Sequence, residues 1–170
     1  MNLFRYVISL IAFGGLVVSA AAQAPQPPPV SPQALASLRG VATEAARNCE
    51  FFLNEAKRVS VRNAQQGQAL AAIRSLHDAA KKYADATTSA RWPRPDWLRT
   101  CSETLLDAWI NVDTTFPQLQ GPPPVVDWWN RSQAALVALY NAAAPLMGRP
   151  TGGSLPMALG GGVSAKPVVK

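Results

Sequence analysis

Apolar residues recur at alternating steps of three and four along most of the chain between residues 31 and 147. The longest run lies between Leu35 and Val59, and no β-strand produces this spacing, because strand side chains alternate with a period of two. Steps of three and four place the apolar residues on one stripe of a helix that packs nearly lengthwise against other helices. The stripe consists of Leu35, Leu38, Ala42, Ala45, Cys49, Phe52, Ala56 and Val59.

Three further segments carry the same pattern. They are separated by proline-containing or polar connections, which predict turns between helices. Four amphipathic helices with short connections predict an all-α fold, specifically a four-helix up-down bundle. The apolar positions are Ala69, Ile73, Leu76, Ala80, Tyr83 and Thr87; then Leu98, Cys101, Leu105, Ala108 or Trp109, Val112 and Phe116; then Val125, Trp129, Ser132, Leu136, Leu139 and Ala143.

Capping residues and prolines mark the ends of these helices. Ser31 before Pro32 is typical of a helix start, and the first helix is expected to run to about Val61. Asn63, with Gln66 three residues later, predicts a capping box for the second helix. The third helix is expected to begin near Pro95 and to stop before Pro117. Pro145 should end the fourth helix near residue 144.

The two ends of the chain lack this helical pattern. Residues 1–24 combine a basic start, an apolar run and an Ala-Gln-Ala site, which predicts a cleaved signal peptide. The alternative is a retained membrane anchor, but the apolar run is shorter than the ~20 residues that span a bilayer. Residues 25–30 predict a proline-rich spacer, residues 31–147 the bundle domain, and residues 148–170 a disordered tail rich in glycine and proline. The mature protein is therefore expected to be periplasmic or secreted.

The formal charge of +6 does not indicate a nucleic-acid-binding surface. Arg5, Arg149, Lys166 and Lys170 lie outside the predicted domain, which leaves 12 basic against 10 acidic residues within it. A nucleic-acid surface concentrates basic charge on one face, and no dense basic run remains here. We therefore expect no nucleic-acid partner.

The two cysteines, Cys49 and Cys101, lie on apolar stripes of the first and third helices. Because an exported protein matures in an oxidising compartment, the pair is expected to form an inter-helix disulfide. The first and third helices of an up-down bundle run parallel. The cysteines reach the same level only if the start of the first helix extends beyond the rest of the bundle.

No metal or cofactor is expected. His77 is the only histidine, and no set of His, Cys or carboxylate residues at metal-ligand spacing accompanies it. Non-covalent haem held by His77 and a methionine such as Met147 is the alternative to an ordinary histidine at the edge of the core. Glu103 and Asp107 lie one helical turn apart, and a solvated acidic strip is favoured over a cation site or a contact with a basic partner.

Tryptophan and arginine gather in one connection. Trp92 and Trp97 flank Pro93-Arg94-Pro95, and Arg99 follows. Exposed tryptophan beside arginine is typical of binding hot spots, so Trp92, Arg94, Trp97 and Arg99 are candidate partner-binding residues. The alternative is that Trp92 and Trp97 close the end of the core. Trp128 and Trp129 are adjacent on a helix, so one of them should remain partly exposed.

These features predict an exported, non-enzymatic helical bundle that binds a protein or an anionic envelope component through an aromatic and basic end. The alternative is a carrier for haem or another apolar molecule held between the helices. An enzyme is disfavoured because the sequence shows no nucleophile motif, no metal set and no glycine-rich phosphate loop.

Overall fold

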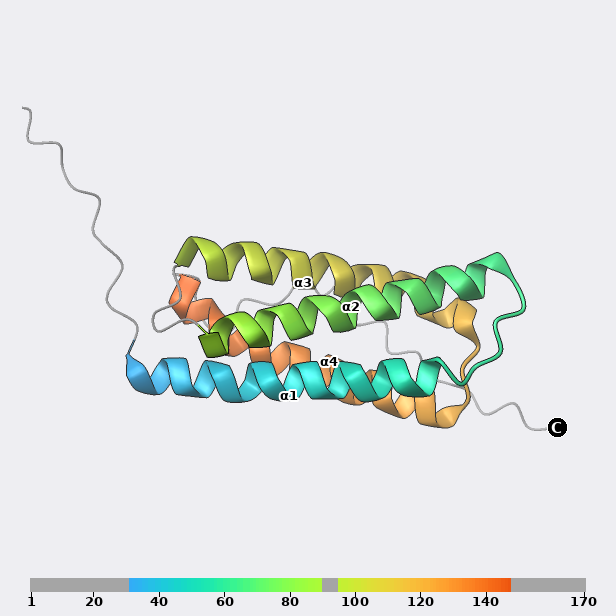
Figure 1. Ribbon diagram of the computed structural model, residues 1–170, viewed down its shortest axis with the longest axis horizontal. Helices are drawn as coiled ribbons and strands as arrows, with labels where there is room; N and C mark the ends of the chain where they lie inside the picture. The colour runs from blue at the N-terminus through green and yellow to red at the C-terminus, as the bar shows by residue number, and fades with distance from the viewer. Residues whose placement is uncertain (1–30, 90–94, 148–170) are drawn as a thin grey trace, which may run out of the picture.

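The computed structural model describes residues 31–89 and 95–147, and within these ranges it contains helices and no strands. The long helices are Pro32–Ala56 (α1), Ala64–Ser89 (α2), Pro95–Thr115 (α3) and Pro123–Ala143 (α4), and the short 3-10 helices are Phe116–Leu119 (η1) and Ala144–Met147 (η2). Each long helix runs opposite to the preceding one (Figure 1). The all-α, helical-bundle prediction is thus confirmed for these residues. The predicted signal peptide, spacer and tail lie outside them.

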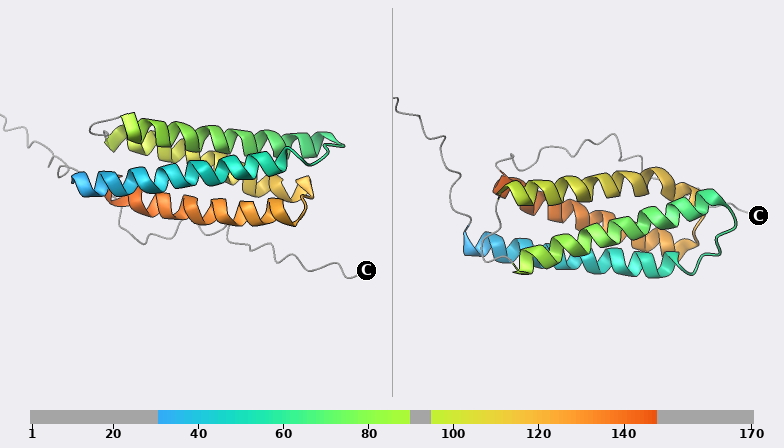
Figure 2. Two further views of the ribbon diagram at one scale, coloured as in Figure 1. Left: turned by 60° about the horizontal axis from the view of Figure 1, so that its bottom comes forward. Right: turned by 45° about the horizontal axis from the view of Figure 1, so that its top comes forward.

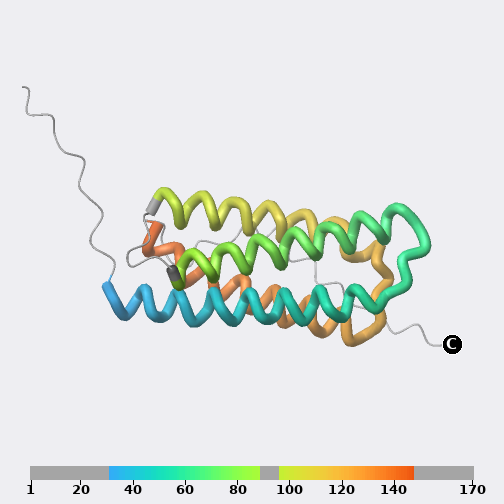
Figure 3. The backbone as a smooth tube through the Cα atoms, viewed as in Figure 1, coloured from blue at the N-terminus to red at the C-terminus, as the bar shows by residue number. Residues whose placement is uncertain are grey.

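The helices do not pack equally closely around the bundle. α1 lies between α2 and α4 and packs closely against both, and α2 also packs against α3. Figure 2 shows these pairs from two further sides, and Figure 3 traces the chain as it reverses direction at each end. The backbones of α3 and α4, in contrast, hardly approach each other. The loosest boundary of the bundle therefore lies between α3 and α4.

Side-chain size explains this difference. α1 contributes Ala42, Ala45 and Ala56 to the core, all fully buried, so the neighbouring backbones can approach closely. Leucines, a tryptophan and a tyrosine stand between α3 and α4 instead and hold the two backbones apart. These larger residues are Leu105, Leu106, Trp109, Leu136, Leu139 and Tyr140.

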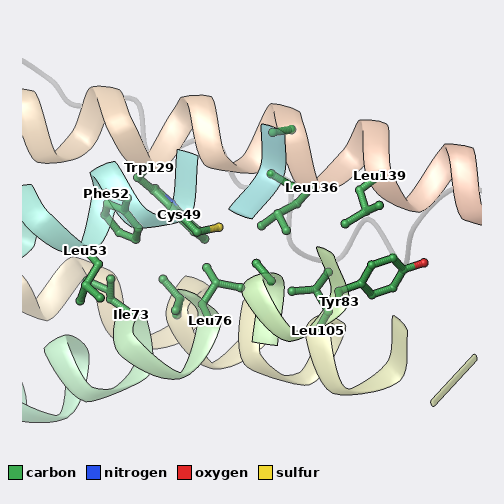
Figure 4. Close-up of a cluster of buried hydrophobic side chains, with 14 of the residues drawn as sticks. Cys49, Phe52, Leu53, Ile73, Leu76, Tyr83, Leu105, Trp129, Leu136 and Leu139 are labelled. Carbon is green, nitrogen blue, oxygen red and sulfur yellow. The ribbon is translucent and has the colours of Figure 1, made fainter. Parts of the chain in front are cut away.

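The core follows the predicted apolar stripes. All predicted positions of the second and fourth stripes are buried, as are those of the first up to Ala56. An aromatic cluster fills the end where α1, η1 and α4 meet: the Trp129 ring centroid lies 5.3 Å from that of Phe52 and 5.6 Å from that of Phe116. Figure 4 shows Phe52 and Trp129 beside Cys49 in this core.

The side-chain caps predicted at Ser31 and Asn63 are confirmed by their hydrogen bonds, although Gln66 bonds to the amide of Arg62, one residue before the Asn63 amide that a capping box would use. The Ala34 amide donates to Ser31 Oγ at 3.1 Å at the start of α1. At the start of α2, the Gln66 amide donates to Asn63 Oδ1 at 2.8 Å, and Gln66 Oε1 accepts from the Arg62 amide at 2.7 Å. The bonds to Ser31 Oγ and Asn63 Oδ1 satisfy amides of the first turn that have no partner within the helix.

Two helix ends differ from their predicted positions. α1 ends at Ala56, and the amides of Arg58 and Val59 bond three residues back instead of four, which tightens the chain into a turn. Val59 still packs against the core, so an apolar period alone could not locate this end. α2 continues past Thr87 to Ser89, since no glycine or proline interrupts it there.

The predicted disulfide between Cys49 and Cys101 is wrong: both residues are free thiols. The contact between the Phe52 and Phe116 rings, with centroids 5.5 Å apart, sets the level of α1 relative to the α3–η1 segment. Cys49 lies three residues before Phe52, whereas Cys101 lies fifteen residues before Phe116. At ~1.5 Å per residue, the cysteines differ in level by roughly 18 Å.

That separation excludes a bridge, because bonded cysteines have their Cα atoms within ~7 Å. α1 starts only slightly further out than α3, so its overhang does not bring the two cysteines to one level (Figure 1). The two helices also lie across the core from each other instead of side by side. The residues near each sulfur differ accordingly: Ser132 of α4 lies near Cys49, and Lys82 of α2 lies near Cys101.

Candidate binding surfaces

The predicted partner-binding end is described only in part. Trp92 and Arg94 lie outside the described residues. Trp97 is half-buried, and its ring centroid lies 6.2 Å from that of Tyr83, so this side chain belongs partly to the core. Arg99 is exposed on α3. The two described members of the set therefore have different environments.

A second aromatic surface crosses the boundary between α1 and α4. Phe51 of α1 and Trp128 of α4 stack with ring centroids 4.7 Å apart and an angle of 27° between the ring planes. Phe51 is 37% exposed, and Trp128 is half-buried, whereas Trp129 is 4% exposed in the core. This confirms the expectation that one of the adjacent tryptophans stays partly exposed.

An arginine lies over each of the two rings. Arg47 Cζ is 5.5 Å from the Phe51 ring centroid, and Arg131 Cζ is 4.8 Å from the Trp128 ring centroid. Arg47 precedes Phe51 by four residues on α1, and Arg131 follows Trp128 by three residues on α4, so each pair lies on one helix face. We call Arg47, Phe51, Trp128 and Arg131 together the Arg–aromatic stack.

The charges of this stack are not neutralised by ion pairs within the described part of the chain. Both arginines are exposed, and neither forms an ion pair or hydrogen bond with another described residue. The cation–π contact limits the motion of each guanidinium while its N–H groups stay accessible. Two oriented guanidinium groups beside an exposed ring can bind carboxylate, sulfate or phosphate groups.

Sequence reasoning missed this stack, although parts of it are visible in the sequence. The spacings from Arg47 to Phe51 and from Trp128 to Arg131 place each arginine beside an aromatic residue on one helix. The pairing of α1 with α4 cannot be read from these spacings. Only the folded bundle brings Phe51 and Trp128 together.

The remaining candidates are the single histidine and one pair of acidic residues on α3. His77 is half-buried on α2, and its Nδ1 lies 3.0 Å from Asp78 Oδ1. Glu103 and Asp107 are both exposed on α3. Among the residues that the structure describes, no group of three or more His, Cys, Asp or Glu side chains is placed to hold a metal ion.

Burial controls the ionisation of several groups. It raises the pKa of Cys49 to about 12, with a smaller opposing effect of Ser132. Burial also raises the pKa of Cys101, an effect that the charge of Lys82 partly offsets. The pKa of Asp113 is raised by burial as well, and Gln133 Nε2 donates to its Oδ1 at 3.4 Å. The raised pKa values of the two cysteines do not favour a reactive thiolate at neutral pH.

A groove follows the loose boundary between α3 and α4, with Tyr83 of α2 at its floor. We call it the α3–α4 groove; it contains about 290 Å³ of empty space, part of it open to solvent. Figure 4 shows Tyr83 beside Leu105 and Leu139, with its hydroxyl directed away from Cys49 and Leu76. The groove is lined mainly by apolar side chains, including those of Leu105, Trp109, Leu136 and Leu139.

Comparison with known proteins gives no match: no family model, no curated protein and no solved structure is similar to this chain. Within residues 31–89 and 95–147, no helix is long and apolar enough to cross a membrane. Function must therefore be inferred from the surfaces of the bundle.

Proposed function

We propose that this protein is an exported, non-enzymatic helical bundle that binds an anionic partner, an acidic protein or an anionic envelope component, through the Arg–aromatic stack. One observation carries the proposal: two arginines without an acidic partner among the described residues lie over two stacked, partly exposed rings. The proposed periplasmic or secreted location rests on the signal-like pattern of residues 1–24.

The chemistry of the stack suits an anion better than a neutral apolar partner. A hydrogen bond between a guanidinium and an anion contributes ~1.5–3 kcal/mol, more than a neutral hydrogen bond. The exposed part of Phe51 adds apolar contact area beside the charges. Because long side chains lose rotamer entropy on binding, arginines already held over the rings lose less of it.

The proposed function is of the class expected from the sequence, but the proposed binding site lies on another surface of the bundle. The sequence predicts the partner site at the Trp92–Arg99 end, yet Trp97 packs partly against Tyr83. The stack instead lies on α1 and α4, where all four of its side chains are described. Trp92 and Arg94 remain a predicted contribution that the same experiment can test.

The test is calorimetric titration of the protein with an oligoglutamate peptide and with dextran sulfate, using oligoglutamine and neutral dextran as uncharged probes. We expect binding of an anionic probe that weakens as salt increases. The double variant Arg47→Gln/Arg131→Gln should lose at least about tenfold in affinity, which corresponds to ~1.4 kcal/mol.

A matched variant separates the stack from net charge. Arg62→Gln/Arg74→Gln removes the same charge from other exposed positions and should bind nearly as well as the unmodified protein. Equal weakening by both double variants would show that overall charge, and not the stack, attracts the probe. A loss confined to Trp92→Ala/Arg94→Ala would return the site to the predicted end of the bundle.

A carrier for haem or another apolar molecule is less well supported. The α3–α4 groove has room for only about 20 Å³ of water-sized occupant, far below the ~300–1,000 Å³ typical of small-molecule pockets. Neither His77 nor Met147, the two expected haem ligands, lines it. We therefore place the carrier function second.

A further inference from the structure

The α3–α4 groove presents an apolar surface that the bundle itself does not cover. Trp109, Leu106 and Tyr140 line it and are only half-buried, so their exposed parts lie together along one boundary. The separation of the α3 and α4 backbones leaves them in this state. The groove is therefore a surface suited to a further apolar segment.

A buried hydroxyl lies at the floor of the groove. Tyr83 is 1% exposed, and within the described part of the chain its Oη has no hydrogen bond of regular geometry. Burial raises the pKa of Tyr83, although the Ser102 side chain lies close enough to lower it in part. A buried polar group without a well-formed hydrogen bond destabilises the fold. An occupant that supplies a hydrogen-bonding group, such as a peptide carbonyl, fits this floor better than a plain hydrocarbon.

The described chain stops close to this groove. Ala143, the last residue of α4, lines the groove, and η2 then packs against α3 up to the buried Met147. The sequence continues with seven residues rich in glycine, residues 148–154, and then with Leu155-Pro156-Met157-Ala158-Leu159. This is an apolar segment within a stretch that otherwise consists largely of glycine, proline and polar residues.

The connecting residues and the apolar segment are long enough to reach the groove and to cover it. Seven connecting residues reach up to ~23 Å, which allows the chain to turn back over the end of the bundle. On α3, Ser102 and Trp109 line the groove seven residues apart, or ~10 Å of helix. Five residues in an extended conformation span ~13 Å, so the segment covers that distance.

We propose that residues 155–159 bind in the α3–α4 groove, with Leu155, Met157 and Leu159 against its apolar walls and a backbone carbonyl accepting from Tyr83 Oη. The docked segment covers the half-buried side chains and completes the one boundary of the bundle where two helices hardly touch. Docking is reversible and is not required for the helices to form. It is independent of the Arg–aromatic stack.

The test uses the full chain and nuclear magnetic resonance. A nitroxide spin label on Ala158→Cys, in a Cys101→Ser background, should broaden the indole N–H signal of Trp109. The same label on Val168→Cys, beyond the segment, should leave that signal much sharper. Buried Cys49 is not expected to take the label in the folded protein.

A second variant links the effect to the apolar side chains. Leu155→Ser/Met157→Ser/Leu159→Ser should shift the Trp109 indole and Ser102 amide signals, and Val163→Ser/Val168→Ser should not. Unchanged Trp109 and Ser102 signals in the triple variant would overturn the proposal. So would equal broadening from the two labels. If 1-naphthol shifts these signals equally in the triple variant and the unmodified chain, the groove belongs to a small molecule and the proposal is wrong.

Discussion

Cys49 lies in the core beside Ser132, with 1% of its surface exposed, whereas Cys101 lies near the surface of α3 and is half-buried. The two thiols therefore differ in access more than in chemistry. The thiolate is the form that attacks a labelling reagent. Burial raises both pKa values, so neither residue should react as fast as an unfolded cysteine. The order of their reactivity follows from exposure.

Thiol labelling of the native protein at pH 8, without reductant, should modify Cys101 slowly and leave Cys49 unmodified. Unfolding in denaturant should then expose two thiols per chain. Cys101→Ser should abolish labelling of the native protein, which provides the control. A chain purified from its native host with no titratable thiol in denaturant would contradict the assignment of both residues as free thiols.

Alkaline pH should destabilise the bundle through Cys49. Its pKa rises from 9.0 to about 12 on burial, so the folded state keeps the proton that the unfolded state releases. This contribution is fully present below pH 9 and is lost as the pH rises towards 12. Between pH 9 and 10.5 we expect a loss of roughly 1–2 kcal/mol in the free energy of unfolding.

Urea denaturation at several pH values measures this slope. Cys49→Ala should flatten it even if the variant is less stable at every pH, because the slope reports proton release and not packing. Part of the slope should remain, since burial also raises the pKa of Tyr83. An unchanged slope in Cys49→Ala would assign the alkaline instability to other groups.

At the scale of the helices, the start of α2 depends on one short side chain. Asn63 Oδ1 accepts from the Gln66 amide, and Gln66 in turn accepts from the Arg62 amide. Asn63→Ala should therefore lower the free energy of unfolding by ~1 kcal/mol, within the 0.5–2 kcal/mol range of capping substitutions. Thermal or urea denaturation measures the loss. Gln65→Ala, an exposed position in the same turn, should change stability by only a few tenths of a kcal/mol.

The existence of the helices could be predicted because each one carries its own apolar period, and α1 and α2 also carry a capping side chain. These signals are local in the sequence: the apolar stripe from Leu35 to Ala56 and the caps Ser31 and Asn63. The structure places them as expected. Helix ends were less predictable. Val59 keeps the apolar period although the helix stops at Ala56, because a residue in the following turn can still reach the core.

Features that join different helices could not be predicted. The level of Cys49 relative to Cys101 depends on how Phe52 meets Phe116, which no single helix encodes. The pairing of Phe51 with Trp128 depends in the same way on the packing of α1 against α4. Sequence spacing determines which residues share a face of one helix, but not their level on a neighbouring helix.

At the scale of the whole molecule, the two proposed surfaces lie on different boundaries of the bundle. The Arg–aromatic stack crosses α1 and α4, and the groove lies between α3 and α4. Substitutions in one share no contact with the other, so their effects should be close to additive. Arg47→Gln/Arg131→Gln should leave the Trp109 signal unchanged, and the triple serine variant of residues 155–159 should leave affinity for oligoglutamate unchanged.

The sparse contact between α3 and α4 also bears on the order in which the bundle opens. A helix with close backbone contact on one side only can detach before the others, as a separate cooperative unit. Native-state hydrogen exchange should therefore show α3 amides exchanging by an opening of lower free energy than the amides of α1, which is packed closely on two sides. Matching exchange free energies in α1 and α3 would mean that the four helices unfold together. If α3 opens first, local opening exposes Trp109 and Leu105 to proteases and chaperones while α1, α2 and α4 remain folded.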